Sequence, residues 1–157
     1  MAKITTIAAA DAPKAVGPYS QARLVSGDAE TLYLSGQLPI NPTTSTMPES
    51  IEEQTEQSLK NMGAILAEAG LSFDNVVKTT VLLADIKDFA AMNGVYATFF
   101  PNEKPARMCY EVAALPMGAK VEIDCPRASR PGAARRNHGR CASCPYLFYE
   151  RTAANSW

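Results

Sequence analysis

Histidine is almost missing from this chain, which has His138 alone among its 157 residues. A single histidine argues against catalysis by a cysteine–histidine pair. No apolar run approaches the roughly 20 residues of a membrane-spanning helix, and residues 4–10 are too short and too rich in threonine and alanine for a secretory leader. The four cysteines are therefore expected to be free thiols of a cytoplasmic protein rather than a disulfide framework.

The net charge of −1 conceals two stretches of opposite sign. Residues 1–125 carry nine lysines and arginines against fifteen aspartates and glutamates, a net charge of −6. An acidic body argues against nucleic-acid binding, which depends on neutralising phosphates. Residues 126–157 carry six arginines, no lysine and one glutamate, a net charge of +5, and have no apolar periodicity. We predict a domain over residues 1–125 and an atypical, disordered tail over residues 126–157, rich in arginine, proline, alanine and cysteine.

Two helices are predicted from their end signals and apolar spacing. Ser50 and Glu53 form a capping box, apolar residues then recur at helical spacing, and Gly70 suits the position just past the end. Asp85 caps the second helix, whose aromatic stripe ends before Pro101. Strands are predicted for residues 22–25, 31–35, 75–83, 105–113 and 120–124. The order ββαβαββ predicts an α+β fold with a single mixed sheet and both helices on one face.

The last two predicted strands hold the most informative pattern. Residues 105–113 and 120–124 alternate polar and apolar side chains, with proline and glycine between them, which predicts a β-hairpin. The apolar face of this hairpin is formed by Met108, Tyr110, Val112, Val121 and Ile123. The opposite, polar face then collects Arg107, Cys109, Glu111, Glu122 and Asp124.

This polar face has two interpretations. Arg107 presents a planar fork that suits a carboxylate, and Glu122 can orient or deprotonate a water molecule. The alternative is an ordinary solvated sheet face on which charged residues pair across strands. After Asp124, Cys125 and Pro126 are expected to interrupt the last strand, because proline removes a donor from the ladder.

Motifs along most of the chain resemble the RidA (YjgF) family of small imine deaminases. The matching segments are GPYSQ (17–21), LSGQ (34–37), VKTTV (77–81), FAAMN (89–93), PARMC (105–109), ALPMG (114–118) and VEI (121–123). They follow the family order over residues 10–125, and the resemblance ends there. It implies the family fold, a homotrimer whose three sheets enclose a central barrel, and a pocket at each subunit interface.

The resemblance also implies an activity and a site. The activity is hydrolysis of reactive enamine and imine acids, such as 2-aminoacrylate and 2-iminobutanoate, to 2-keto acids and ammonia, without metal or cofactor. Arg107 clamps the substrate carboxylate, Glu122 positions the attacking water, and Cys109 lines the pocket beside them as a third catalytic candidate. The remaining substrate-binding positions are Tyr19, Ser35 and Asn93. Each of these three also has a structural interpretation, as a packing aromatic, a strand-end residue and an exposed helix residue.

Other functions stay open at this point. Ribonuclease activity is a second enzymatic possibility within the family, and the acidic body and the lack of a catalytic histidine argue against it. A noncatalytic ligand-binding or chaperone-like trimer is a third possible function. It is favoured if the interrupted last strand disrupts the pocket. Zinc-type side chains occur at Cys125, His138, Cys141 and Cys144, but nothing around the last three predicts a helix or strand to hold them. The prediction is therefore a metal-free site.

Overall fold

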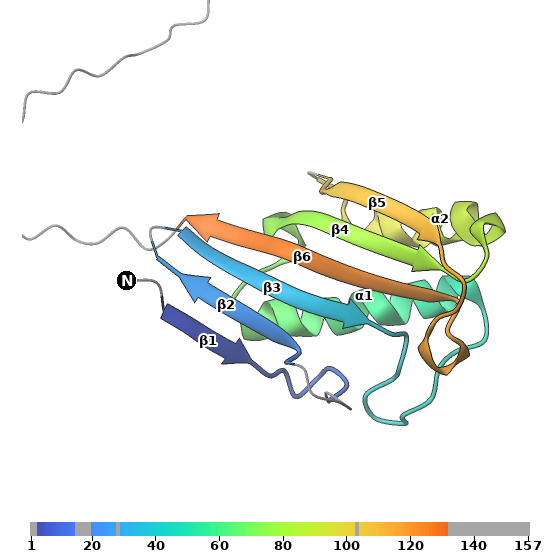
Figure 1. Ribbon diagram of the computed structural model, residues 1–157, viewed down its shortest axis with the longest axis horizontal. Coiled ribbons are helices and arrows are strands. Elements are labelled where there is room, and N and C mark those ends of the chain that lie inside the picture. Colours follow the sequence, from blue (N-terminus) through green and yellow to red (C-terminus); the bar gives the residue numbers. More distant parts are fainter. Residues whose placement is uncertain (1–2, 15–19, 28, 103, 132–157) are drawn as a thin grey trace, which may run out of the picture.

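The computed structural model describes residues 3–14, 20–27, 29–102 and 104–131. The strands within these ranges are β1 (Lys3–Ile7), β2 (Ala22–Ser26), β3 (Ala29–Gln37), β4 (Val76–Leu83), β5 (Ala106–Glu111) and β6 (Val121–Pro131). The helices are α1 (Ile51–Glu68) and α2 (Phe89–Phe99), with short 3-10 turns at Phe73–Asn75, Ile86–Asp88 and Pro116–Gly118. The six strands form one sheet in the order β1-β2-β3-β6-β4-β5 (Figure 1).

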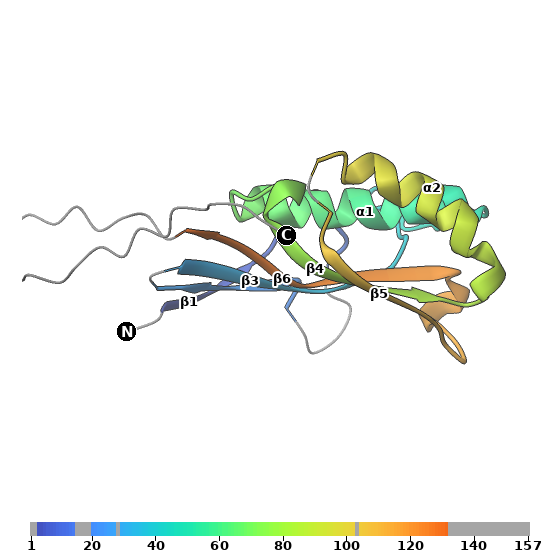
Figure 2. The ribbon, with the colours of Figure 1, turned by 90° about the horizontal axis from the view of Figure 1, so that it is seen from above.

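The sheet is mixed and both helices cover the same face. β4 and β5 run parallel, joined through α2, while the other neighbouring strands are antiparallel. Figure 2 shows α1 and α2 side by side on one side of the sheet, and no helix of the described residues covers the other side, which is called the uncovered face below. The predicted α+β class is therefore confirmed. β1 was not predicted, and it adds a strand at the β2 edge.

Helix α1 begins and ends where the sequence predicts. The backbone N–H of Glu53 donates to Ser50 Oγ at 3.2 Å, and Ser50 Oγ donates to Glu53 Oε2 at 3.0 Å. Gly70 follows the helix with φ of 68°, a left-handed conformation that glycine adopts without strain. Leu59 and Met62 of this helix are fully buried against the sheet, so its position is fixed by packing as well as by its cap.

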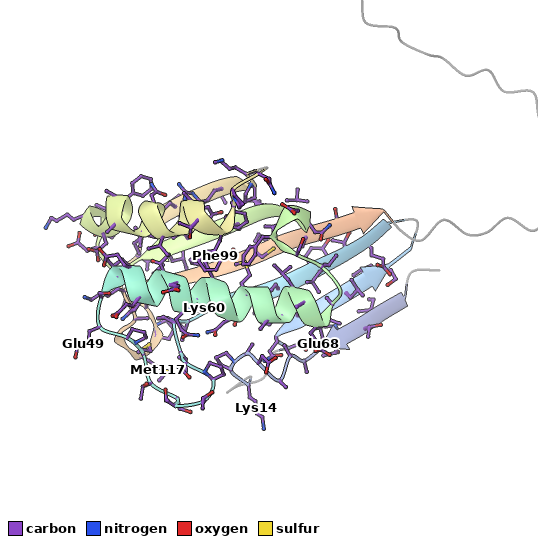
Figure 3. All side chains as sticks on the ribbon, turned by 180° about the vertical axis from the view of Figure 1, so that it is seen from behind. Lys14, Glu49, Lys60, Glu68, Phe99 and Met117 are labelled. Carbon is purple, nitrogen blue, oxygen red and sulfur yellow. The ribbon has the colours of Figure 1, made fainter. Side chains whose placement is uncertain are left out.

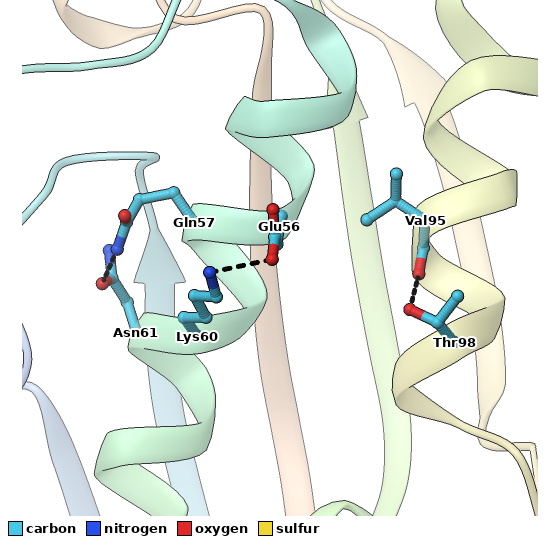
Figure 4. Close-up of polar contacts among 6 residues, drawn as sticks. All are labelled: Glu56, Gln57, Lys60, Asn61, Val95 and Thr98. Atoms are coloured by element: carbon cyan, nitrogen blue, oxygen red, sulfur yellow. Dashed lines mark hydrogen bonds and ion pairs between the residues drawn. The ribbon is translucent and has the colours of Figure 1, made fainter.

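Asn61 of α1, a buried side chain that pairs with Gln57 on the same helix (Figure 4), also holds a loop of the chain. Asn61 Nδ2 donates to the carbonyl oxygens of Leu38 at 3.0 Å and Ile40 at 2.9 Å, and Asn61 Oδ1 accepts from Gln57 at 2.8 Å. The loop after β3 is thereby held against the helix. The other pair in this view on α1, Glu56 with Lys60 at 2.8 Å, is exposed and contributes about 0.3–0.5 kcal/mol.

Helix α2 starts later than predicted. Asp85 accepts from the backbone N–H of Lys87 at 2.9 Å and so caps the short turn Ile86–Asp88, after which α2 proper begins. On its exposed side, Thr98 Oγ1 donates to the carbonyl of Val95 at 2.7 Å (Figure 4). Neither helix of the described chain is long and apolar enough to cross a membrane.

The predicted hairpin of the last two strands is wrong. β4 lies between β5 and β6, parallel to the first and antiparallel to the second. The physical reason lies in β4 itself, whose Val81 and Leu83 are fully buried. Such an apolar strand is most stable in the interior of a sheet with a partner on each edge, whereas a β5–β6 hairpin would leave it with one. The connection between β5 and β6 therefore passes over a strand instead of making a tight turn.

The predicted interruption of the last strand is also wrong. β6 continues past Cys125 to Pro131 and pairs with β3 along its length. Between Ala128 and Cys125 it holds one residue more than β3 does between Leu32 and Leu34, so Pro126 lies in a β-bulge, where a missing N–H is tolerated. Residues 132–157 lie outside the described part, and the division of the chain into a body and a tail stays a prediction.

The length of β6 predicts how truncation of the chain changes its stability. Ending the chain after Cys125 removes fully buried Ala128 and the β3 partners of residues 29–32. We expect the unfolding free energy to fall by about 2–4 kcal/mol, the sum of a few ladder hydrogen bonds and a small cavity. Urea unfolding measures this change. Ending the chain after Pro131 is the control and should leave the midpoint near that of the full chain; equal midpoints for the two truncations would contradict the extended β6.

Candidate active site

Arg107 reaches the helix face of the sheet. β4 and β5 pair Thr79 with Arg107 in register, and Thr79 is fully buried under α2. The guanidinium carbon lies 4.6 Å from the ring centroid of Tyr96 and 5.7 Å from that of Phe89, both on α2. At these distances a cation is attracted to the ring faces. Arg107 is thus held by two aromatic rings of the helix above its strand.

A cavity of about 430 Å³ opens beside this arginine and is called the Arg107 cavity below. Its lining includes Asn93, Tyr96, Lys104, Pro105 and Arg107. Asn93 lies three residues before Tyr96 on α2, so both meet the cavity from one side of the helix. Among the described residues, no carboxylate or carbonyl accepts a hydrogen bond from the Arg107 side chain. The fork is therefore available to an external carboxylate.

Cys109 lies one step further along the same face. It is half-buried and packs against the core beside Val81, its partner on β4. Burial raises the pKa of the Cys109 thiol above its ordinary value of 9.0, and the positive charge of Arg107 lowers it only in part. The thiol is therefore protonated near neutral pH, which argues against a nucleophilic role.

Glu122 points to the other face of the sheet. Its neighbours Val121 and Ile123 are fully buried on the helix side, and Glu122 is paired in register with half-exposed Leu82 on β4. Burial raises the pKa of Glu122 above its ordinary value of 4.5, and the nearby Asp124 raises it further. A carboxyl with this shift is better matched to proton transfer near neutral pH than an ordinary one.

A second cavity, of about 620 Å³, contains Glu122 and Ser35 and is called the Glu122 cavity. Ser35 Oγ donates to the carbonyl of Ser20 at 2.9 Å. The α1-bound loop after β3 forms an apolar wall with Leu38 and Ile40. Lys14 and Met117, labelled in Figure 3, also line it.

Gly36 explains how Glu122 fits into that cavity. A Cβ at position 36 would overlap the carboxylate Oε1 of Glu122 and crowd its Cδ. A side chain at position 36 would therefore displace the Glu122 carboxylate, the flexible end of that side chain, from its place in the cavity. Sequence reasoning included Gly36 in a motif but assigned it no role.

The predicted polar face does not exist as one surface. Arg107 and Cys109 face the helices, whereas Glu122 and Asp124 face the opposite side. Met108 and Tyr110, predicted on one apolar face with Val121 and Ile123, are instead 39% and 50% exposed on the face opposite the helices. The error follows from the predicted hairpin. Side chains alternate between the two faces of each strand, and the register of β5 and of β6 with β4, not with each other, determines which of their residues share a face.

The predicted site residues thus fall into two groups. Arg107 and Asn93 line one cavity, and Glu122 and Ser35 line the other, with no lining residue in common. Tyr19 lies outside the described residues. Of the four zinc-type side chains, Cys125 is buried in β6, and His138, Cys141 and Cys144 lie outside the described part. Sequence reasoning missed Phe89 and Tyr96 as contacts of Arg107, although both stand on the predicted aromatic stripe.

Comparison with known proteins gives consistent matches. The family described as endoribonuclease L-PSP matches residues 9–127. A goat (Capra hircus) protein named 2-iminobutanoate/2-iminopropanoate deaminase is 52% identical over 119 residues, which cover 75% of this chain and 85% of that protein. Reactive Intermediate Deaminase A, chloroplastic, of Arabidopsis thaliana is 51% identical over 115 residues, 73% of this chain and 60% of that protein. The solved structure of E. coli TdcF with bound serine has a TM-score of 0.74 at 39% identity, covering 80% of this chain and 98% of that chain.

Gly36→Ala tests the packing of Glu122. The added methyl group should displace the carboxylate toward solvent, so the pKa of Glu122 should fall back toward 4.5. The unfolding free energy should change little, because only the flexible end of the Glu122 side chain has to move. An NMR titration of the Glu122 carboxyl measures the first effect. Gly94→Ala is the matched control, because a Cβ at position 94 meets nothing within 4 Å. An unchanged Glu122 titration in Gly36→Ala would show that the close approach is unimportant.

Proposed function

We propose that this chain, which belongs to the endoribonuclease L-PSP family and to its RidA deaminases, hydrolyses 2-imino acids to 2-keto acids and ammonia. Its membership confirms the resemblance drawn from the sequence motifs. The observation that carries the proposal is the half-buried, aromatic-stacked Arg107, whose fork opens into a cavity with Asn93. The proposed substrates are 2-iminobutanoate and 2-iminopropanoate, with their enamine forms such as 2-aminoacrylate.

Carboxylate capture is the first part of the proposed mechanism. Two parallel N–H donors of Arg107 meet the two oxygens of the substrate carboxylate, and each such charge-assisted bond contributes about 1.5–3 kcal/mol. Asn93 supplies a donor and an acceptor at the same cavity. A relative at 39% identity, TdcF, holds serine, which carries the same carboxylate group. The clamp selects 2-carboxylated imines and fixes the imine carbon for attack.

Water attack is the second part. The Glu122 carboxylate accepts a proton from a water molecule, whose oxygen forms a bond to the imine carbon while the C=N electrons move to nitrogen. Glu122 returns this proton to the nitrogen, which gives a neutral carbinolamine. As the carbonyl forms and the C–N bond breaks, the hydroxyl proton passes through Glu122 to the departing nitrogen, which leaves as ammonia. The net reaction is imino acid plus water to 2-keto acid plus ammonia. This step requires general acid–base catalysis with a rate enhancement of about 10²–10⁴-fold. It needs no thiolate from Cys109.

Assembly is the third part, because one copy does not bring the two groups into one cavity. We place Arg107 and Asn93 of one copy against Ser35 and Glu122 of a neighbour in a homotrimer. The uncovered sheet face supports self-association, since it exposes large apolar side chains that a partner would cover. These are Tyr33, Val77, Met108 and Tyr110, each 39–52% exposed. Tyr19, Ser35 and Asn93 are proposed to contact substrate, and the proposed compartment is the cytoplasm.

Coupling the purified protein to a threonine dehydratase tests the function. The dehydratase releases 2-iminobutanoate, and the chain should accelerate the appearance of ammonia and 2-oxobutanoate. Arg107→Ala should lower kcat/KM at least 100-fold, and Arg107→Lys should remain severely impaired because a point charge does not replace a bidentate fork. Rates for Arg107→Ala within twofold of wild type would contradict the carboxylate clamp. Cleavage of RNA without imine hydrolysis would favour the ribonuclease alternative.

The raised pKa of Glu122 predicts the pH dependence of the reaction. Because the base form is the carboxylate, kcat/KM should fall as pH decreases through this pKa, and the midpoint should lie above 4.5. Glu122→Gln should lower kcat about 100-fold with a smaller change in KM and should abolish this acidic limb. Asp124→Asn removes the neighbouring charge and should move the limb to lower pH. A limb that persists in Glu122→Gln would assign the base to another residue.

A further inference from the structure

Tyr96 joins three parts of the fold at one point. Its hydroxyl and that of Thr79 form a hydrogen bond of 2.7 Å, which ties α2 to β4. Its ring stacks on Phe100 with a centroid distance of 4.6 Å and an interplanar angle of 28°. Phe100 in turn meets the edge of Phe73 at 5.1 Å. With 6% of its surface exposed, Tyr96 has a ring that is fixed at both its hydroxyl end and its face.

Arg107 lies over this fixed ring, and Thr79 is its partner in the sheet. The register pairs Thr79 directly with Arg107, so the hydrogen bond from Thr79 holds the ring above the neighbouring strand. Phe89 approaches the same guanidinium at 5.7 Å. Within the described chain no ion pair or side-chain acceptor orients the fork. The aromatic contacts are therefore what sets the plane of the guanidinium.

We propose that Tyr96 is a positioning residue of the proposed carboxylate clamp, with its ring setting the plane of Arg107 and Thr79 fixing the ring. The proposal rests on the proposed function for its chemical meaning. A ring attracts the cation through its π electrons and takes no carboxylate-type hydrogen bond from the fork, so the N–H groups stay available to a substrate carboxylate. An arginine oriented before binding loses less conformational freedom when the substrate arrives.

The hydroxyl must stay neutral for this arrangement. Burial raises the pKa of Tyr96 above 10.0, while the hydrogen bond with Thr79 and the charge of Arg107 lower it in part. A phenolate here would pair with the arginine and compete with a substrate carboxylate. The neutral hydroxyl instead bonds to Thr79 and leaves the positive charge of Arg107 to the cavity.

Four single variants separate positioning from packing. Tyr96→Leu removes the ring, Tyr96→Phe and Thr79→Val each remove the hydrogen bond, and Phe99→Leu is the matched control. Phe99 lies on the same helix and packs edge-on against Phe73 at 5.4 Å without approaching the guanidinium (Figure 3). The measurements are kcat and KM for imine hydrolysis, the Kd of 2-oxobutanoate by NMR, and the ring-current shift of the Arg107 Nε–H proton.

The expected pattern is specific to positioning. Tyr96→Leu should raise KM and the Kd of 2-oxobutanoate about tenfold with kcat within twofold, and should reduce the ring-current shift to the smaller part that Phe89 causes. Tyr96→Phe and Thr79→Val should each raise both constants about two- to threefold, and the double variant should raise them no further, since both remove one bond. Phe99→Leu should lower the melting temperature without changing KM. In an Arg107→Ala background, Tyr96→Leu should not weaken binding further.

Two results measured with substrate or 2-oxobutanoate would overturn the proposal: an unchanged KM in Tyr96→Leu, or the same tenfold loss in the Arg107→Ala background. If the proposed deaminase function is wrong, the experiments give a different set of results. In that case the wild type hydrolyses no imine, while the shifted Arg107 proton in the wild type and the reduction of this shift in Tyr96→Leu still support the positioning role. An unshifted Arg107 proton in the wild type would overturn it whatever the activity.

Discussion

The insertion of β4 between β5 and β6 is the constraint on which the rest of the structure depends. Because one face of β4 is deeply buried, with Val81 and Leu83 fully so, it needs a partner on each edge, and it therefore separates the two strands that carry Arg107 and Glu122. Side chains alternate along each strand, so this placement directs Arg107 toward the helices and Glu122 away from them. The two separate cavities on one copy follow from that one arrangement, and they are the reason for the proposal that a second copy unites them.

Arg107 and Glu122, the two parts of the proposed site, are each positioned by the residues around them. On the helix face, the ring centroids of Tyr96 and Phe89 lie 4.6 and 5.7 Å from the guanidinium carbon, and the rings hold the cation beside the cavity. On the other side, the missing side chain of Gly36 makes room for a carboxyl whose pKa burial has raised. A cation without an anionic partner and a partly desolvated acid are both costly in free energy, and such groups concentrate where a ligand completes them.

Local signals in the sequence were sufficient for the helices and for the fold class. The capping box at Ser50 and Glu53 and the glycine at position 70 each act through neighbours within a few residues, so their meaning does not depend on the rest of the fold. Strand pairing does depend on it. Two alternating segments joined by proline and glycine can pair with each other as a hairpin, or they can lie on either side of a third strand. The burial of β4 decides for the second arrangement. The bulge that accommodates Pro126 and the pairing of β1 are likewise tertiary features.

The candidate residues were found through the family motifs, while their grouping into two cavities required the structure. Mixing two inactive variants tests the central claim, that the site is shared between neighbouring copies. Arg107→Ala and Glu122→Gln, unfolded together in equal amounts and refolded, should form mixed trimers in which about a quarter of the shared sites hold both intact groups. The account predicts recovery of imine hydrolysis toward a quarter of the wild-type rate. Mixed trimers, verified by native mass spectrometry, that remain as inactive as either parent would contradict it.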